Sequence, residues 1–374
     1  MASAFRKNHS TSDHMLRLQQ SVKEGFNTSD ETGPVFFDIS KAFDRTWHKG
    51  LNFKIHKLKV PQYLACWIGN FLIGRRFYVH NNGTNSSLRP IEAGVPQGSC
   101  LSATLFSIYM SDIEDALKKH FPRIKMALYA DDLCIWARSR TKDELRIALQ
   151  MAIDSIDIFC SNWCLELNIN KSNLTMFTTA GYRSSYSRLH HIALFSNGNP
   201  IALNPNPTFL GFTLDPKLNM LASIKKTIEK GNSRLNVLKI LKSKFRKHNI
   251  NHKFLINIYK GFVLPLIGYN HIPYLGISAN ILSKLQIFQN KALRICLNAP
   301  IYTKISLLHS RANIPILSTR LSTLSKNYFL KSLKTNKLIM SERDAYQVDP
   351  DVREGSNLSK RQPHKTPLFY LINR

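Results

Sequence analysis

The sequence is poor in acidic residues for its length of 374 residues. It has 24 Asp and Glu against 52 Lys and Arg, which gives a formal net charge of +28. A folded chain with this excess of one sign repels itself unless a polyanion offsets the charge. Nucleic acid is the natural polyanion, because each neutralised phosphate releases condensed counterions. An anionic membrane surface is the alternative.

Long apolar runs and paired cysteines are also missing. No charge-free apolar segment is long enough to span a bilayer, and the start MASAFRKNHS has no apolar core of the kind a secretory signal needs. We therefore expect an intracellular protein of the nucleus and cytoplasm, not secreted and without a membrane partner. Of the six cysteines, Cys160 and Cys164 have helical spacing, but no second pair completes a zinc set. Free thiols in a reducing compartment are expected.

Short apolar strands alternate with amphipathic helices through the first 216 residues. Strands are predicted at residues 34–39, 126–136 (two strands meeting at a tight turn), 165–169, 174–178 and 209–214. Helices are predicted at about 10–26, 47–58, 61–73, 101–117 and 141–163, and a hairpin joins 76–80 to 88–92 across Asn82-Gly83. This alternation predicts an α+β fold, in the form of a split βαβ sheet with helices on one face. Beyond Lys217 the pattern is helical and basic.

Acidic residues at predicted strand ends are the clearest chemical signal. Asp131 and Asp132 stand side by side between two apolar strands, and Asp38 ends another. Burying adjacent carboxylates is costly unless cations share the site. Three carboxylates at the ends of strands in one sheet could hold two Mg²⁺ ions. For the Asp-Asp pair taken alone, surface acids that cap turns or helices are the favoured interpretation.

Several ordered blocks then resemble one family, the reverse transcriptases of non-LTR retrotransposons, and most closely the jockey-type elements of animals. The blocks similar to the polymerase motifs A to E of that family are FFDISKAFDRTWHKGL (36–51), IEAGVPQGSCLSATLFSIYMSDI (91–113), ALYADDLCIWA (127–137), LELNINKS (165–172) and FLGFTLD (209–215). Two further blocks, AFRKNHSTSDHMLRL (4–18) and FQNKALRICLNAPIY (288–302), extend the resemblance to about residue 310.

The resemblance implies the palm of a right-hand polymerase, followed by a helical thumb and a C-terminal helical region. The implied divisions are a remnant of the fingers (1–33), the palm with motifs A to E (34–216), a basic helical thumb (217–275), a C-terminal helical region (276–335) and a loosely structured tail (336–374). Further fingers motifs and an endonuclease would lie upstream in a full-length element. Neither is in this chain, which we expect to be truncated at its N-terminus.

The resemblance also implies the chemistry of RNA-directed DNA synthesis. Asp38 and Asp131 would be the principal ligands of two Mg²⁺ ions, with Mn²⁺ as an alternative, and Asp132 would be the third acid. The backbone carbonyl of Ile39 would add a ligand. Lys171 would neutralise or protonate the leaving pyrophosphate; taken without the resemblance it is a solvated lysine.

Four further residues match positions that hold the incoming dNTP in the family. Phe43 would be an aromatic gate against the ribose 2′-hydroxyl, although a core phenylalanine is the plain alternative. Gln97 would contact the nucleotide, and Gly98 would let the backbone approach it closely. Arg6 would grip the triphosphate. Asp44 also matches a family residue, but we expect it to anchor Arg45, His48 or a backbone amide.

The segment from Lys225 to Lys260 has eleven Lys or Arg and one acid, Glu229. A solvated helix face is the usual meaning of such a charge run. Within the resemblance it is the thumb, where a face with Lys225, Lys226, Arg234 and Lys242 would follow the backbone of an RNA template and a DNA primer without reading sequence.

Three functions remain open at this point. The first is an RNA-directed DNA polymerase, and the second is a remnant that binds RNA without synthesis. The third is an RNA-dependent RNA polymerase or an intron maturase, which share the palm. The intact acids favour the first function over the second. Phe43, with Ala-Asp-Asp in place of Gly-Asp-Asp, favours it over the third.

Overall fold

The computed structural model describes residues 6–118, 121, 123–179, 185–244, 252–348 and 367–368. The chain divides into two compact units. Unit 1 consists of Met1–Thr11, Asp30–Met176 and Ser187–Asn204, and unit 2 of Ser12–Ser29, Phe177–Tyr186 and Pro205–Arg374. Within the described residues, no helix is both long and apolar enough to cross a membrane.

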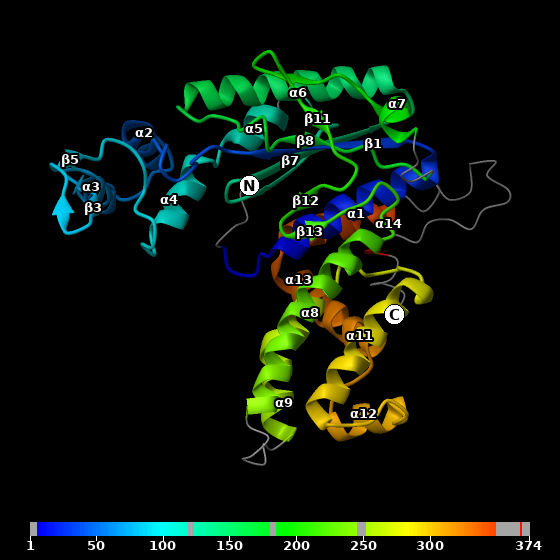
Figure 1. Cartoon of the computed structure of the whole chain (residues 1–374). Coiled ribbons are helices and arrows are strands. Elements are labelled where there is room, and N and C mark those ends of the chain that lie inside the picture. The colour runs from blue at the N-terminus through cyan, green and yellow to red at the C-terminus, as the bar shows by residue number, and fades with distance from the viewer. Residues whose placement is uncertain are drawn as a thin grey trace. The chain divides into compact units, whose positions relative to one another are not determined.

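A five-stranded sheet forms the centre of unit 1 (Figure 1). Its order is β11-β8-β1-β7-β6. The strands are β1 (Glu31–Asp38), β6 (Lys125–Tyr129), β7 (Asp132–Ser139), β8 (Asn173–Leu174) and β11 (Ala202–Leu203). β1 pairs antiparallel with both β7 and β8, and only β11 runs parallel to its neighbour. The apolar residues of β1 and β7 are buried almost completely, which explains why both strands read as continuous apolar runs.

Helix α6 (Lys142–Asn162) covers one face of this sheet, as Figure 1 shows. Thr141 caps its start, because the Thr141 side chain accepts a hydrogen bond from the Glu144 amide. Gly33 of β1 allows the close packing, since an added Cβ would lie 3.2 Å from Leu145 and Leu149 of the helix. The mixed helix-and-sheet class predicted from the sequence is confirmed. The small pair β9 (Phe195–Ser196) and β10 (Asn199–Pro200) also belongs to unit 1.

The single helix predicted over residues 101–117 is wrong. It is divided into α4 (Ser102–Tyr109) and α5 (Ile113–Lys118). The Lys54 ammonium donates to the Tyr109 carbonyl, which a continuous helix would use for residue 113, and it also pairs with Asp112. A side chain from another helix therefore replaces the hydrogen bond that would have continued α4.

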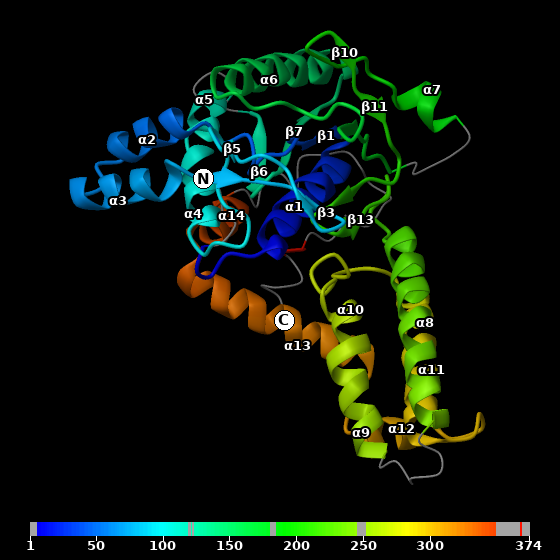
Figure 2. The ribbon, with the colours of Figure 1, turned by 60° about the vertical axis from the view of Figure 1, so that its left-hand side comes forward.

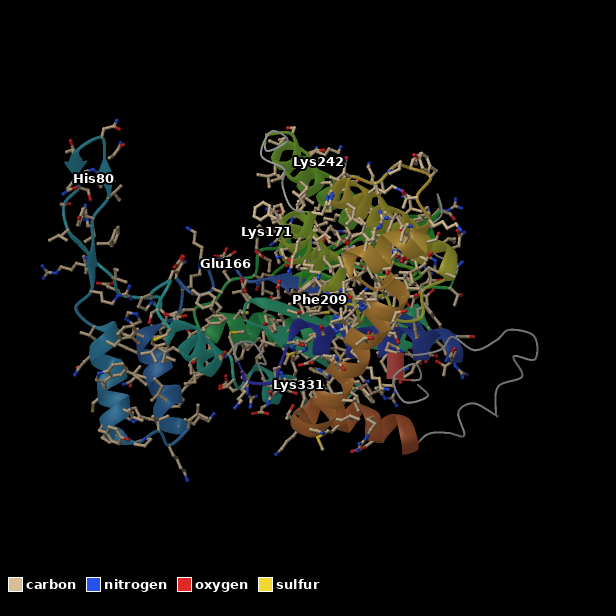
Figure 3. The ribbon with its side chains drawn as sticks, turned by 90° about the horizontal axis from the view of Figure 1, so that it is seen from below. His80, Glu166, Lys171, Phe209, Lys242 and Lys331 are labelled. Carbon is tan, nitrogen blue, oxygen red and sulfur yellow. The ribbon has the colours of Figure 1, made fainter. Side chains whose placement is uncertain are left out.

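A lobe of residues 47–93 lies between β1 and α4 in the sequence. It contains α2 (His48–Lys57), α3 (Gln62–Leu72) and two short strand pairs, which are β2 (Arg76–Phe77) with β5 (Arg89–Pro90) and β3 (His80–Asn81) with β4 (Thr84–Asn85). Asn82 and Gly83 both have positive φ at the hairpin tip, as the Asn-Gly pair predicted. Figure 3 shows this hairpin, with His80 near its end, extending away from α2 and α3.

Two predicted strands of unit 1 are shorter than expected. Residues 165–169 contribute only an isolated bridge between Leu167 and Ile39, and of the predicted strand 174–178 only Leu174 lies in a strand, β8. Cys164 has a φ of 53°, and the amides of Lys171 and Ser172 both donate to the Asn168 carbonyl. A turn therefore ends the first strand after the bridge.

Helices dominate unit 2 (Figure 2). In chain order these are α1 (Thr11–Thr28), α8 (Leu221–Lys244), α9 (His252–Ile258), the π-helix η2 (Tyr259–Val263), α10 (Leu264–Gly268), α11 (Ala279–Leu297), α12 (Ile305–Ala312), α13 (Leu317–Thr335) and α14 (Lys337–Val348). The short helix α7 (Tyr186–His190) belongs to unit 1 except for its first residue. The predicted strand at 209–214 is the hairpin of β12 (Thr208–Phe209) and β13 (Phe212–Thr213). Helices α8 and α11 pack side by side.

The first helix packs against the last ones. Asp13 of α1 is fully buried and accepts hydrogen bonds from Tyr328 and from the Asn336 amide at 2.8 Å. Ile339 and Leu368 join the apolar cluster around Leu16. Part of the predicted loose tail is thus ordered, whereas residues 349–366 and 369–374 lie outside the described residues. The domain limits given above stay predictions.

Candidate active site

The predicted metal ligands lie where the central strand pair ends. Asp38, the last residue of β1, is in register with Asp132, the first residue of β7. Asp131 precedes it in the two-residue turn from β6, where Ala130 has a φ of 55°. An alanine in this left-handed conformation costs about 1–2 kcal/mol, so the flanking ladder holds the turn against a local preference.

Negative charge accumulates around Asp132. Although the residue as a whole is exposed, partial desolvation of its carboxyl, followed by the charges of Asp131 and Asp38, raises its pKa to about 6. Carboxylates crowded in this way favour a bound proton or a cation. No group of three or more His, Cys, Asp or Glu side chains is already arranged as a metal site in the described part of the chain. The fold thus brings the three acids within electrostatic range of one another without assembling them into a cluster.

The loop after α6 lies against the end of β1. The Lys171 ammonium is 3.5 Å from a carboxylate oxygen of Asp38, and both side chains are partly exposed. Figure 3 labels Lys171 and Glu166 on this loop. The Asn168 amide donates to the Asp38 carbonyl at 2.7 Å, and the Ser40 amide donates to the Glu166 carbonyl at 2.8 Å. Neither bond uses the carbonyl of Ile39, which lies between them.

Phe43 is half-buried and stacks on Phe106 of α4, with ring centroids 4.6 Å apart. The Val95 amide donates to the Phe43 carbonyl at 2.9 Å, so the loops of motif A and motif B are joined at this residue. The contact with Phe106 is compatible both with a gate and with a core phenylalanine. The structure thus fixes the position of the ring and leaves its role a prediction.

Gln97 and Gly98 lie in the loop before α4. Gln97 is exposed, and its amide donates to the Asp44 carboxylate at 3.0 Å. The partner of Asp44 is therefore a side chain that the sequence analysis did not consider. Gly98 has a φ of 89° with open space beside it, so a larger residue would meet strain without a clash.

Gly94 was not singled out from the sequence. Its φ is 88°, and an added Cβ would lie 2.8 Å from the carbonyl oxygen of Asp44. The Gly94 amide donates to the Thr46 carbonyl, and the His48 ring donates to the Gly94 carbonyl at 2.8 Å. Only glycine allows this close approach of the two loops. Its place, with Gly98, in the loop between the predicted hairpin and the buried helix was the signal that could have identified it.

Arg6 belongs to the N-terminal segment of unit 1, and the basic thumb residues belong to unit 2. Arg6 is exposed, and its carbonyl accepts a hydrogen bond from the His9 amide at 3.2 Å. The other four cations (Lys225, Lys226, Arg234 and Lys242) lie on α8, and Figure 3 labels Lys242.

Helix α8 lines a cavity of about 380 Å³ within unit 2. Lys226, Lys230 and Arg234 line it from the helix, and Thr213 and Tyr269 line it from neighbouring segments. The Lys226 ammonium also donates to Thr208 at 3.3 Å, and Arg234 stacks over the Phe262 ring at 4.7 Å. Lys230 was missed from the sequence, although its spacing of four from both Lys226 and Arg234 places all three on one helix face.

Comparison with known proteins agrees with this arrangement. The family described as "Reverse transcriptase (RNA-dependent DNA polymerase)" matches residues 2–214, which is more than half of the chain. The chain belongs to the reverse transcriptase family. Members of this family generally use divalent metal ions.

Curated relatives of this chain come from mobile elements of flies. The chain is 30% identical to the RNA-directed DNA polymerase from mobile element jockey of Drosophila melanogaster, over 98% of this chain and 40% of that protein. It is 29% identical to the probable RNA-directed DNA polymerase from transposon BS of the same species, over 87% of this chain and 35% of that protein. The chain therefore spans about two fifths or less of these relatives, and the predicted likeness to jockey-type elements is confirmed.

Solved structures similar to this chain include two telomerases from Candida species. The telomerase of Candida albicans, in complex with a fragment of telomeric RNA, has a TM-score of 0.43 and 11% identity, over 92% of this chain and 54% of that one. The telomerase of Candida tropicalis with such a fragment has a TM-score of 0.41 and 13% identity, over 84% and 54% of the two chains.

Proposed function

We propose that this chain is the polymerase part of a non-LTR retrotransposon reverse transcriptase, which extends a DNA primer on an RNA template. The observation that carries the proposal is the register of the central ladder. Asp38 and Asp132 face each other at the strand ends, with Asp131 in the adjoining turn, in a chain of the reverse transcriptase family. The names of the mobile-element relatives support the same reaction.

Asp38 and Asp131, helped by Asp132 and the carbonyl of Ile39, would hold two Mg²⁺ ions. The raised pKa of Asp132 supports this assignment, because a site that favours a bound proton is one where a cation relieves the same crowding. When bound, the ions would activate the primer 3′-hydroxyl and stabilise the leaving pyrophosphate. Lys171, which now neutralises Asp38, would be free to turn toward the pyrophosphate once metal takes over that charge.

The motif loops would hold the incoming dNTP. Phe43, fixed by Phe106 and by the Val95 amide, would exclude a 2′-hydroxyl, so that Phe43→Val raises the incorporation of ribonucleotides relative to deoxynucleotides. An unchanged ratio would mean that Phe43 is a core residue. Gln97, oriented by Asp44, and Gly98 would contact the nucleotide, and Arg6 would contact the triphosphate.

Helix α8 would follow the template–primer backbone. The cavity beside it is lined by Lys226, Lys230 and Arg234 together with hydroxyl groups, which is a suitable surface for phosphodiester oxygens. Lys225 and Lys242 extend the positive charge along the same helix. Affinity for a template–primer should then fall steeply with salt, and reversal of Lys225, Lys226, Arg234 and Lys242 to Glu should flatten this slope.

Primer extension on poly(rA)/oligo(dT) with dTTP and Mg²⁺ tests the proposed reaction. The purified chain is expected to extend the primer weakly, and Asp131→Asn, purified in parallel, serves as the control for contaminating polymerases. A template-dependent product from the wild type only would support the proposal. If neither protein extends the primer although the wild type binds it, the alternative holds, namely an RNA-binding remnant without synthesis.

A further inference from the structure

The lobe of residues 47–93 lies in a stretch of the chain that has no acidic residue. Between Asp44 and Glu92 the sequence contains no Asp or Glu. The same stretch contains eight Lys or Arg, which are Arg45, Lys49, Lys54, Lys57, Lys59, Arg75, Arg76 and Arg89. Lys54 is buried and Arg45 pairs with Glu166, but the other six cations are at least partly exposed. A surface of this composition attracts polyanions and repels basic partners, including a second copy of this strongly basic chain.

Large aromatic side chains of this lobe face solvent. On α3, Tyr63 is 72% exposed and Trp67 is 56% exposed, and the two residues share one helix face. The Trp67 ring stacks almost parallel on Phe71, with an interplanar angle of 9°. On the hairpin, Phe77 and Tyr78 are about half exposed, and every residue from Arg76 to Pro90 is exposed. Soluble proteins seldom leave so many aromatic rings in water without a partner for them.

The base of the lobe is joined to the motif loops. Trp47 and Ala93 form an isolated bridge, and the Gly94 amide donates to the Thr46 carbonyl. Beyond this bridge lie Phe43 and Val95 with their own backbone bond. A strand bound along the lobe would thus be held next to the residues that we assign to the nucleotide.

We propose that this lobe binds the unpaired part of the RNA template, by stacking bases on Tyr63, Trp67 and the hairpin aromatics while Arg76 and Arg89 neutralise phosphates. Exposed aromatic rings among cations, without acids, are the combination that holds single-stranded nucleic acid, because every base has a face that can stack. Paired bases are already stacked on each other, so duplex RNA does not satisfy these rings. The inference rests on the proposed function for the identity of the strand as the template.

Equilibrium binding without dNTP and without Mg²⁺ tests the lobe separately from catalysis. Two fluorescent substrates are compared by anisotropy, a blunt RNA–DNA duplex and the same duplex with a 15-nucleotide single-stranded 5′ extension of the RNA. Tyr63→Ala/Trp67→Ala should weaken binding of the extended substrate at least about tenfold and leave binding of the blunt duplex within about twofold. Arg76→Ala/Arg89→Ala should have the same selectivity with a smaller effect.

The matched control is Ile147→Ala/Ile158→Ala, which removes two exposed apolar side chains from α6 in the same unit. It should change the affinity for neither the extended substrate nor the blunt duplex. Thermal unfolding should show that this control and the two double variants of the lobe are folded. Trp67→Phe, made alone, should keep most of the affinity because a ring remains.

Wild-type affinity of both lobe variants for the extended substrate would overturn the proposal. So would a loss of self-association in sedimentation, without a change in RNA affinity, because the lobe would then be an interface between copies. If the wild type extends no primer but the selective loss is observed, the proposed synthesis fails and the RNA-binding surface stands.

Discussion

The central sheet and the lobe belong to the same compact unit, yet they use the same side-chain types in opposite ways. In β1 and β7 the aromatic and aliphatic side chains are buried, and three acids are concentrated at one end of the ladder. In the lobe the aromatic side chains face solvent, and the surrounding 47 residues contain no acid. Burial on the sheet gives the acids fixed positions, because a slip of one residue would turn every buried side chain to the wrong face.

The two regions meet different needs: the sheet has to hold acids in fixed positions, whereas the lobe has to attract a ligand. Acids that share a metal would depend on placement within fractions of an ångström, and the buried ladder fixes the register of Asp38 opposite Asp132. A flexible strand needs an attractive surface that tolerates many sequences, and exposed rings with cations provide that. The contacts of Gly94 join the loops of motif A and motif B, and those of Lys54 join the lobe to α4 and to the end of α6. Substitutions at these two residues should therefore disturb the link between the lobe and the rest of the unit first.

Glycine substitutions should have the largest effect on the free energy of unfolding. The cost should differ between the loop at Gly94 and the hairpin tip at Gly83. Gly94 and Gly83 have φ values of 88° and 81°, but only at Gly94 would an added Cβ meet backbone, the Asp44 carbonyl at 2.8 Å. Gly94→Ala should reduce the free energy of unfolding by about 3 kcal/mol or more, since strain and overlap add. Gly83→Ala, at the open hairpin tip, should cost about 1 kcal/mol. Urea unfolding measures both, and equal costs would show that the two loops are not held together at Gly94.

Lys54 should be the next largest determinant. Burial lowers the pKa of its ammonium to about 8, against the opposing effect of Asp112, and the ammonium lies 3.5 Å from the centre of the Trp163 ring. Lys54→Ala should cost about 2–3 kcal/mol of unfolding free energy, because a cavity and an unpaired Tyr109 carbonyl remain. Lys54→Met should restore much of the loss by filling the space between the rings. Lys57→Ala, an exposed position on the same helix, should stay within about 0.5 kcal/mol. A cost at Lys57 equal to that at Lys54 would contradict the structural role of the aromatic contacts.

The smallest expected effect concerns pH. The folded-state pKa of Asp132, about 6, lies above the ordinary value of 3.8, so the folded chain binds this proton more tightly than the unfolded chain. Its contribution to stability is therefore lost as pH rises from about 4 to 6, and Asp132→Asn should not show this loss. Because the residue is exposed, the difference at pH 7 should be no more than about 1 kcal/mol. Mg²⁺ should stabilise the wild type more at pH 7 than at pH 5, and melting curves without such a difference would argue against metal at this carboxylate.

Much of the fold was predictable because local patterns decided it. The apolar run before Asp38, the two strands around Asp131-Asp132 and the helix capped by Thr141 all fall within a few residues of their predicted limits. The Asn82-Gly83 turn followed from the preference of these residues for positive φ. The division of the helix over 101–117 was not predictable, since it depends on Lys54, which is 55 residues away from Tyr109 in the sequence.

The site was predictable in its residues and less so in their contacts. Periodicity and the family resemblance selected Asp38, Asp131 and Asp132, but the register that pairs Asp38 with Asp132 is a property of the sheet. The bond from Gln97 to Asp44 and the close approach at Gly94 join segments about fifty residues apart. Such long-range contacts leave no periodic signal in a single sequence. Lys230 is the exception, because its helical spacing was visible and was not used.

The most direct test of the central claim compares two acids of one segment in primer extension. Asp38 ends β1 opposite Asp132, whereas Asp44 only orients Gln97. Asp38→Asn should reduce extension on poly(rA)/oligo(dT) at least about a hundredfold without changing template–primer affinity, since it removes a charge that the metal ions require. Asp44→Asn should keep extension within about tenfold of the wild type. Near-normal extension by Asp38→Asn, or an equal loss in both variants, would contradict the assignment of the metals to the end of the strand pair.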